Sequence, residues 1–181
     1  MNKAIQIIKK GGVLLHKTDT IWGLACDAKK TKSIKKIYSI KKRDLNKPLI
    51  ILVSSKKMLN EYVDKVPENI LSLINTKNGL VTIIYPNPKG IPEILIHKKS
   101  IAIRITKNKK CQEIINKINQ PIVSTSANIS GEPFPKKFSE INDEIKESVD
   151  YILTEKNEDT VNKPSSLYRI NEKQELEYVN R

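Results

Sequence analysis

A run of four small polar side chains is the part of this sequence best suited to chemistry. In PIVSTSANISG, residues 121–131, apolar residues lead into Ser124, Thr125, Ser126 and Asn128. Buried in a core, each hydroxyl or amide would cost about 1–3 kcal/mol if it were left without a partner. At the end of a strand, the same groups can face a polar ligand. A Ser/Thr-rich turn is the alternative, since these residues also make local hydrogen bonds in caps and turns.

Three other segments place polar or cationic side chains next to apolar runs. They hold Thr18, Asp19 and Thr20, then Lys41, Arg43 and Lys47, then Ser100 and Arg104. If these segments converge, they form a groove rich in cations and hydroxyls, with Asp19 as its one acid. Such a groove suits a polyanion beside a small polar molecule, with catalysis by positioning and charge stabilisation. Lys41 also fits as a cation at a helix C-terminus, and a solvated loop charge is the favoured interpretation of Lys47.

The arginines are informative because lysine is the default cation of this chain. Only four are present, Arg43, Arg104, Arg169 and Arg181. An arginine kept in a lysine-rich chain indicates a use for its rigid fork of donors, which suits carboxylate and phosphate. Chance retention is equally open for any one of them, but Arg43 and Arg104 fall in the segments above.

Several common sites are absent from the sequence. It has no GxxxxGK[ST] loop, GxGxxG, GxSxG elbow or HExxH helix, so phosphate would have to be held by side chains. The cysteines and histidines are scattered, at Cys26, Cys111, His16 and His97. They predict neither a zinc site nor a disulfide framework, so we expect no metal ligand and no structural metal.

Size and composition predict one domain with its own core. The chain has 181 residues and a formal net charge of +13, which invites a nucleic-acid interpretation. The lysines are scattered and lack interleaved aromatic residues, so the charge is permissive only. No apolar run reaches the length of a membrane span and no signal peptide is present, so we expect a cytoplasmic protein without a membrane partner.

Expected helices and strands interleave along the chain. Helices are predicted at 3–10, 31–42, 55–62, 67–75 and 138–147, with one more that carries Cys111, Ile114, Ile115 and Ile118. Strands are predicted at 13–16, 49–53, 80–85, 101–105, 121–124, 150–153, 166–170 and 175–179, and a loop at 17–28. This order favours an α/β fold on a mixed sheet, in a single domain.

Four motifs together resemble one known family. HKTDTIWGLACDA, KKRDLNKPLIILV, SIAIRIT and PIVSTSANISG are similar, in order and spacing, to the YrdC-like family of threonylcarbamoyl-AMP synthases. The resemblance covers roughly residues 1–170 and is far more specific than any single motif. It implies a short, single-domain form over residues 1–181, with a twisted mixed β-sheet flanked by helices and a concave basic groove.

The resemblance also implies an activity, that of a nucleotidyltransferase. The family condenses L-threonine, bicarbonate or CO₂ and ATP to L-threonylcarbamoyl-AMP, with release of pyrophosphate. This is the first step towards the N6-threonylcarbamoyladenosine of tRNAs that read ANN codons. The implied partners are ATP with Mg²⁺, threonine, bicarbonate and downstream proteins that transfer the group to tRNA, while direct tRNA binding stays open.

Residue roles follow from the matched motifs. The family's Lys-x-Arg element falls on Lys41 and Arg43, and its Ser-x-Asn element on Ser126 and Asn128. The resemblance implies that these four are catalytic and that they bind ATP together with Ser100. The residues implied for threonine are Thr18, Arg104, whose fork matches the carboxylate, Ser124 and Ser165.

The chain departs from the family pattern at several positions. Lys17 stands where a proline is usual, residues 78–80 replace a Pro-Gly-Pro, and residues 165–167 replace a Ser-Thr-Ile/Val. The family's late Arg-x-Gly is missing, and whether Arg181 replaces it is open. Two alternatives therefore stand beside the synthase: an RNA-binding module on the same fold, and a folded but inactive copy.

Overall fold

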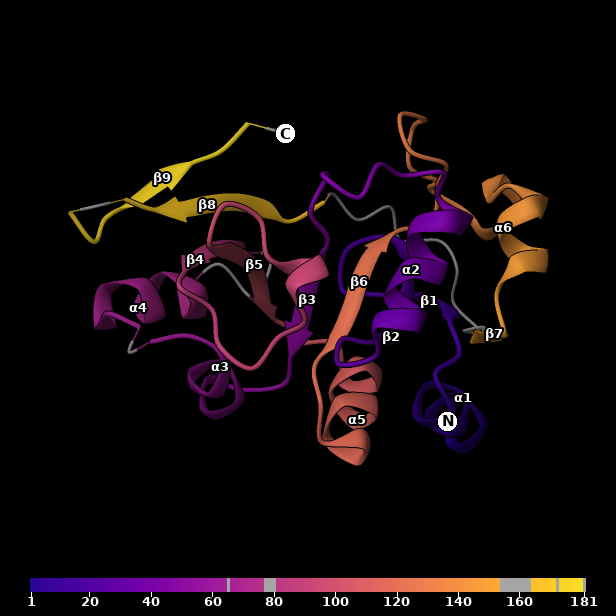
Figure 1. Cartoon of the computed structure of the whole chain (residues 1–181), viewed down its shortest axis with the longest axis horizontal. Helices are drawn as coiled ribbons and strands as arrows, with labels where there is room; N and C mark the ends of the chain where they lie inside the picture. The colour runs from indigo at the N-terminus through magenta and orange to yellow at the C-terminus, as the bar shows by residue number, and fades with distance from the viewer. Residues whose placement is uncertain (65, 77–80, 154–163, 172, 181) are drawn as a thin grey trace.

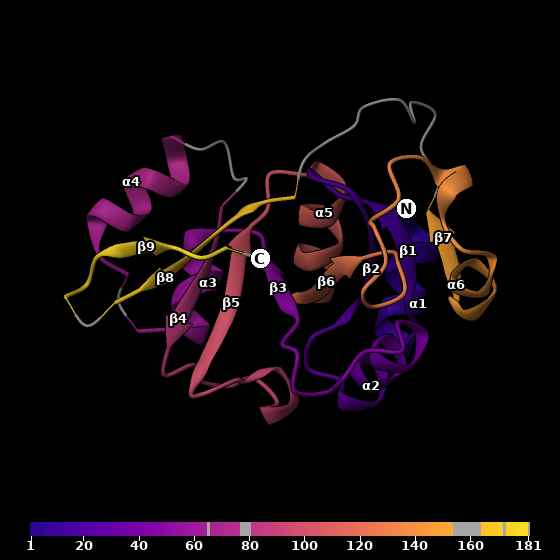
Figure 2. The ribbon, with the colours of Figure 1, turned by 90° about the horizontal axis from the view of Figure 1, so that it is seen from above.

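A single mixed sheet organises the part of the chain that the structure describes. The computed structural model describes residues 1–64, 66–76, 81–153, 164–171 and 173–180. Within them, nine strands follow one another in the order β7-β1-β2-β6-β3-β5-β4-β8-β9 (Figure 1), and Figure 2 shows this order from right to left. The strands are β1 (Leu14–Lys17), β2 (Trp22–Asp27), β3 (Ile50–Val53), β4 (Val81–Pro86), β5 (Ser100–Ile105), β6 (Ile122–Ser126), β7 (Tyr151–Leu153), β8 (Ser166–Ile170) and β9 (Leu176–Tyr178).

The pairing of the strands confirms the α/β fold expected from the sequence. The pairs β1–β7, β3–β5 and β4–β8 are parallel, whereas the other neighbours in the sheet are antiparallel. The α-helices are α1 (Asn2–Lys10), α2 (Thr31–Ile40), α3 (Lys56–Tyr62), α4 (Glu68–Thr76), α5 (Lys109–Ile118) and α6 (Asp143–Ser148). Two short 3₁₀-helices, η1 (Glu93–Leu95) and η2 (Phe138–Glu140), complete the described elements.

Local signals in the sequence explain where helices begin and end. Helix α1 stops at Gly11, which has the left-handed φ of 91° that glycine tolerates and donates its amide to the Ile8 carbonyl at 2.9 Å. Helix α5 starts after Asn108, whose side-chain oxygen accepts the Cys111 amide at 3.0 Å. Along α5, Cys111 and Ile114 are fully buried, as the helical spacing predicted.

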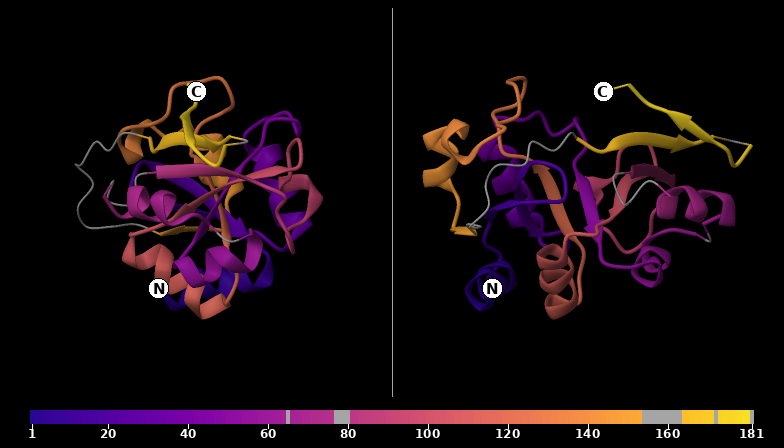
Figure 3. Two further views of the ribbon diagram at one scale, coloured as in Figure 1. Left: turned by 90° about the vertical axis from the view of Figure 1, so that its left-hand side faces the viewer. Right: turned by 180° about the vertical axis from the view of Figure 1, so that it is seen from behind.

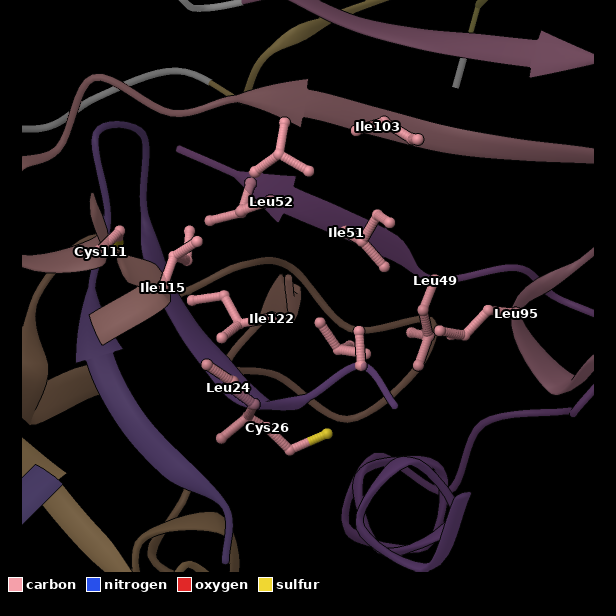
Figure 4. Close-up of a cluster of buried hydrophobic side chains, with 14 of the residues drawn as sticks. Leu24, Cys26, Leu49, Ile51, Leu52, Leu95, Ile103, Cys111, Ile115 and Ile122 are labelled. Atoms are coloured by element: carbon pink, nitrogen blue, oxygen red, sulfur yellow. The ribbon is translucent and has the colours of Figure 1, made fainter. Parts of the chain in front are cut away.

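The core lies between the central strands and the helices that cover them. Figure 4 shows Leu24 from β2, Ile51 from β3, Ile115 from α5 and Ile122 from β6 packed together, all fully buried. Helices α1, α3 and α5 lie along one side of the molecule, and β9 on the opposite side (Figure 3). The core is continuous on one face of β2, β6, β3 and β5. Because this core is close-packed, these strands hold the side chains on their other face in fixed positions.

Three segments differ from the sequence prediction. Residues 22–27, expected within a loop, form β2. The sequence does not reveal this strand because all six of its residues are buried, so apolar and polar residues do not alternate along it. Strand β6 continues through Ser126, so Ser124 and Thr125 lie within the strand rather than after it. The helix expected at 138–147 is divided into η2 and α6, with Asn142 capping the second piece through the Glu144 amide at 2.8 Å.

A strained turn before β5 gives a stability prediction. His97 and Ser100 exchange both backbone hydrogen bonds, and the two residues between them, Lys98 and Lys99, have φ of 47° and 56°. Such two-residue turns favour Asn-Gly because both central residues need a positive φ. We expect Lys98→Asn/Lys99→Gly to raise the free energy of unfolding by about 1–2 kcal/mol per residue, measured by urea denaturation. The control Lys98→Ser/Lys99→Ser removes the same charges without relieving φ, and an equal gain there would contradict the strain.

Candidate functional site

One cavity collects most of the side chains that the sequence singled out. It has a volume of about 750 Å³ and lies over β6, β3, β5, β4 and β8. Of the nine predicted site residues, eight line it: Thr18, Arg43, Ser100, Arg104, Ser124, Ser126, Asn128 and Ser165. The ninth, Lys41, does not line it. The volume is in the range of small-molecule sites. Residues from five separate segments therefore meet around a space that could hold a ligand.

The turn between β1 and β2 forms one wall and is held by Thr18. The Thr18 hydroxyl accepts the backbone amides of Thr20 and Ile21 at 3.0 and 3.2 Å and donates to the Ile21 carbonyl at 2.9 Å. The second residue of β2 is Gly23, where a Cβ would lie only 2.9 Å from the Thr125 carbonyl oxygen. A side chain at Gly23 would therefore push β2 away from β6, the strand that carries Ser124 and Ser126.

Arg104 reaches the cavity from β5 and is already paired. It is 2% exposed, its Nη2 lies 3.0 Å from Oδ1 of Asp19, and its Nη1 donates to the Thr20 hydroxyl at 3.4 Å. Burial lowers the pKa of the Arg104 guanidinium, and the Asp19 charge acts in the opposite direction. Its Nε is buried without a hydrogen-bond partner among the described residues, so one donor of the fork is unsatisfied in the absence of a ligand.

Asp19 is the counter-ion of Arg104 rather than an acid of the cavity wall. Its Oδ2 accepts the Thr106 hydroxyl at 3.1 Å and the Lys107 amide at 3.2 Å. The wall instead contains Glu132, so the expectation that Asp19 is the one acid of the groove is wrong. The sequence did not reveal this because Asp19 and Arg104 are brought together only by the fold.

Lys41 lies beneath the cavity and fixes the loop that follows β6. Its ammonium donates to the Ser126 carbonyl at 2.5 Å, the Asn128 carbonyl at 2.7 Å and Oδ1 of Asn128 at 3.3 Å. The Lys41 carbonyl in turn accepts the Ser130 amide at 2.8 Å. Lys41 is 1% exposed, so it holds the Ser-x-Asn element in place from behind.

The titration of Lys41 gives a pH prediction. Burial, followed by the nearby Arg43 charge, lowers the pKa of Lys41 to about 7. Below this pH the ammonium supplies three hydrogens to its three oxygen acceptors, and above it the neutral amine supplies two. We expect the rate of the reaction at this site to lose this support as pH rises from about 6 to 8. In Lys41→Arg the cation persists, so the ratio of variant to wild-type rate should rise through pH 7, and a constant ratio would contradict this.

Arg43 shapes the loop before β3 and presents a cation to the cavity. Its Nε donates to the Lys47 carbonyl at 3.1 Å and its Nη2 to the Pro48 carbonyl at 3.0 Å. Tyr38 donates to the same Lys47 carbonyl at 3.2 Å. Burial lowers the pKa of Arg43, but a guanidinium stays charged at neutral pH. Arg43 and Lys47 therefore make this wall positive.

The remaining hydroxyls are held by short hydrogen bonds. Ser100 donates to the His97 carbonyl at 2.7 Å, and the hydroxyls of Ser165 and Thr82 lie 2.7 Å apart. Seven further polar residues of the wall were not among the nine predicted site residues: Thr20, Asn46, Lys47, His97, Thr125, Glu132 and Arg169. For Arg169 a signal was present, since arginine is rare in this chain. His97 and Glu132 carry no such signal.

Some expectations concern groups or residues that bear less directly on the cavity. Within the described residues, no three His, Cys, Asp or Glu side chains gather as a metal site would require. No helix in the described ranges is both long and apolar enough to cross a membrane. The replaced motif at residues 78–80 and Arg181, which was considered as a substitute for the late Arg-x-Gly, lie outside the described residues.

Comparisons with known proteins agree with the fold and the motifs. Residues 6–179 match the family model Sua5_yciO_yrdC, described as telomere recombination. A protein of Methanocaldococcus jannaschii is 34% identical over 175 residues, which are 93% of this chain and 81% of the relative. The threonylcarbamoyl-AMP synthase of Wigglesworthia glossinidia brevipalpis is 34% identical over 143 residues, 77% of this chain and 74% of that enzyme.

A solved structure shares the fold. The crystal structure of P. abyssi Sua5 complexed with L-threonine superposes with a TM-score of 0.84 at 24% identity over 92% of this chain. The match covers 49% of the Sua5 chain, so the present chain spans about half the length of that protein. At this identity the likeness establishes the fold.

Proposed function

This chain belongs to the Sua5/YciO/YrdC family, and from that premise we propose that its cavity is the active site of a threonylcarbamoyl-AMP synthase. The reaction joins L-threonine, bicarbonate or CO₂ and ATP to give L-threonylcarbamoyl-AMP and pyrophosphate. It supplies the first step towards N6-threonylcarbamoyladenosine in tRNAs that read ANN codons. The observation that carries the proposal is the meeting of a buried arginine fork, a cationic loop and a Ser-x-Asn element in one cavity.

Threonine would occupy the end of the cavity near Arg104. The unsatisfied Nε of Arg104 is a donor in a buried setting, where a carboxylate forms a strong, charge-assisted hydrogen bond. Ser124 and Ser165 line the same cavity with hydroxyls that can bind the amino acid's polar groups, while Thr18, whose hydroxyl is engaged within its own turn, holds the wall in place. Asp19, beside the guanidinium, keeps Arg104 oriented.

ATP would lie towards the opposite wall. Arg43 places its guanidinium there, Ser100 its hydroxyl, and Ser126 and Asn128 close the wall after β6. Asn128 is rigid, since its amide donates to the Ile129 carbonyl at 3.0 Å and the Glu132 carbonyl at 2.6 Å. Fixed donors and cations around a triphosphate stabilise the charge that shifts onto pyrophosphate as it leaves.

The chemistry needs positioning more than proton transfer. The threonine amine adds to CO₂ and loses a proton, which gives a carbamate. A carbamate oxygen then attacks the α-phosphorus of ATP, and the bond to the β-phosphate oxygen breaks to release pyrophosphate. Both reactants are anions, so the task of the site is to hold them together against repulsion, which Arg43, Lys47 and Arg104 favour. Asp19 is engaged by Arg104 and is not assigned the role of general base.

Magnesium enters this proposal as part of the ATP substrate. Glu132 is the one carboxylate residue in the cavity wall of the described chain, which does not suffice for a resident metal site. Mg²⁺ often reaches proteins on substrate phosphates, keeping several waters and few protein ligands. We assign no residue to it and no step that depends on it.

The proposed assignment extends to the chain and its partners. Residues 1–181 would form the synthase domain, and its product would pass to a cytoplasmic protein that modifies tRNA. The RNA-binding alternative is not favoured, since the relatives reported above include a synthase and the motifs that match it line one cavity. Direct contact with tRNA would show as RNA binding that weakens steeply with salt.

The proposal is tested by pyrophosphate release from the purified protein with ATP and Mg²⁺. Release that requires both L-threonine and bicarbonate is expected. Release that is independent of threonine would indicate another acceptor or a contaminating ATPase. No release from a folded protein would contradict the proposal and favour an RNA-binding or inactive protein.

Arg43→Ala tests the ATP wall. We expect kcat/KM for ATP to fall about 10- to 100-fold, because each charge-assisted hydrogen bond contributes about 1.5–3 kcal/mol. The fold should survive, since Arg43 is only half-buried and, within the described residues, its side chain donates to two carbonyls of its own loop. Steady-state kinetics and thermal unfolding separate the two effects. Arg43→Lys keeps a charge without the fork, so its kcat/KM for ATP should lie between those of the wild type and Arg43→Ala. Near-wild-type turnover in Arg43→Ala would contradict a role for Arg43 in the site.

A further inference from the structure

Strand β8 and Ser165, the residue before it, direct every second side chain towards the cavity. Ser165, Leu167 and Arg169 line it, at positions i, i+2 and i+4. Tyr168 and Ile170, between and beyond them, pack against the hydrophobic core instead. Because successive side chains of a strand point to opposite faces, Arg169 belongs to the cavity face by geometry.

Arg169 stands at one end of a row of cavity residues that crosses the sheet. In register, Ser124 of β6 lies beside Ile50, Ile50 beside Ala102, Ala102 beside Ile84 and Ile84 beside Arg169. All five line the cavity. At roughly 4.8 Å per strand, the row measures about 19 Å, with a polar group at each end and an apolar floor between them.

The Arg169 guanidinium is available to a ligand. Within the described residues it makes no hydrogen bond or ion pair, whereas Arg104 is neutralised by Asp19. The acid opposite it on β9 is Glu177, whose carboxylate accepts the Asn171 amide at 3.1 Å. Arg169 is thus a cation of the wall without a protein counter-ion among the described contacts.

We propose that Arg169 binds the β- and γ-phosphates of the nucleotide, the part that leaves as pyrophosphate. The assignment of the nucleotide rests on the proposed function. The β- and γ-phosphates carry the most negative charge of any group in that reaction. A guanidinium fork can donate to two of their oxygens at once. The threonine end is served by Arg104 and Ser165, and Arg169 lies four residues along β8 from Ser165, about 13 Å away. Arg169, Arg43 and Lys47 are thus three cations that line the same cavity.

The test measures binding of inorganic pyrophosphate, AMP and L-threonine by calorimetry to wild type, Arg169→Gln and Arg169→Lys. We expect Arg169→Gln to weaken pyrophosphate binding ~10- to 100-fold and to leave the other two within about twofold. The affinity of Arg169→Lys for pyrophosphate should lie between those of the wild type and Arg169→Gln, because the lysine keeps the charge and loses the fork. The matched control Glu177→Gln, at the paired position on β9, should bind all three as wild type does.

Four binding results would overturn the assignment. Unchanged pyrophosphate binding in Arg169→Gln, or no pyrophosphate binding by the wild type, removes Arg169 as a phosphate ligand. Loss of threonine binding alone would move Arg169 to the amino-acid end, and equal loss of all three ligands would make its role structural. If the wild type binds pyrophosphate but shows no threonine-dependent turnover, the proposed function fails while the comparison of variants still decides the role of Arg169.

Discussion

Asp19→Ala is expected to lower the free energy of unfolding by about 3–5 kcal/mol, because it leaves the Arg104 charge buried without its counter-ion. Arg104 is 2% exposed and Asp19 is its ion-pair partner at 3.0 Å, while Oδ2 of Asp19 also holds Thr106 and Lys107. Urea denaturation of the variant and the wild type measures the loss.

Two controls separate this effect from simple loss of a surface charge. Asp64 pairs with Lys89 at 3.7 Å on the exposed surface, so Asp64→Ala should cost no more than about 1 kcal/mol. In the double variant Asp19→Ala/Arg104→Met no charge is left buried, so its loss should be smaller than the sum of the two single losses. A cost for Asp19→Ala as small as that for Asp64→Ala would contradict the role of this pair.

Lys41→Met is expected to reduce threonine-dependent pyrophosphate release about 100-fold, although Lys41 does not line the cavity. Without the ammonium, two backbone carbonyls and Oδ1 of Asn128 lose their donor, and the loop that carries Asn128 can shift. A misplacement of about 1 Å near reacting groups can cost about 100-fold in rate. Kinetics of the purified variant measure this loss.

The same substitution should also affect stability. Lys41 is buried, so its loss should cost about 1–3 kcal/mol for the unsatisfied carbonyls. The matched control is Lys42→Met, since the neighbouring lysine is 59% exposed and pairs with Glu144 on the surface. Equal activity in the Lys41→Met and Lys42→Met variants would exclude the positioning role of Lys41.

The sequence predicted elements with a clear period better than those without one. Helix α5 and strand β5 were found because Cys111 and Ile114, or Ile101 and Ile103, recur at helical or alternating spacing. Strand β2 was missed because it is buried on both faces, so its residues do not alternate. Elements such as α5 and β5 are thus visible in the local sequence, whereas β2 is recognised only once the fold shows that both of its faces are buried.

The candidate site was predicted by residue type, and its internal contacts were not. Motif residues such as Thr18 and Ser126 line one cavity, which their order in the chain could suggest. The pairing of Asp19 with Arg104 and the anchoring of Lys41 beneath the wall join residues 85 or more positions apart. Such contacts depend on how strands are ordered in the sheet, which no local pattern encodes.

The most direct test of the proposed function follows the carbon atom that the reaction adds. Purified protein is incubated with radiolabelled bicarbonate, ATP, Mg²⁺ and L-threonine, and the nucleotide products are separated. The proposal predicts label in a threonylcarbamoyl-AMP product that appears only when threonine is present and is strongly reduced in Arg43→Ala. Pyrophosphate release without label in any nucleotide, or labelling that does not depend on threonine, would contradict it.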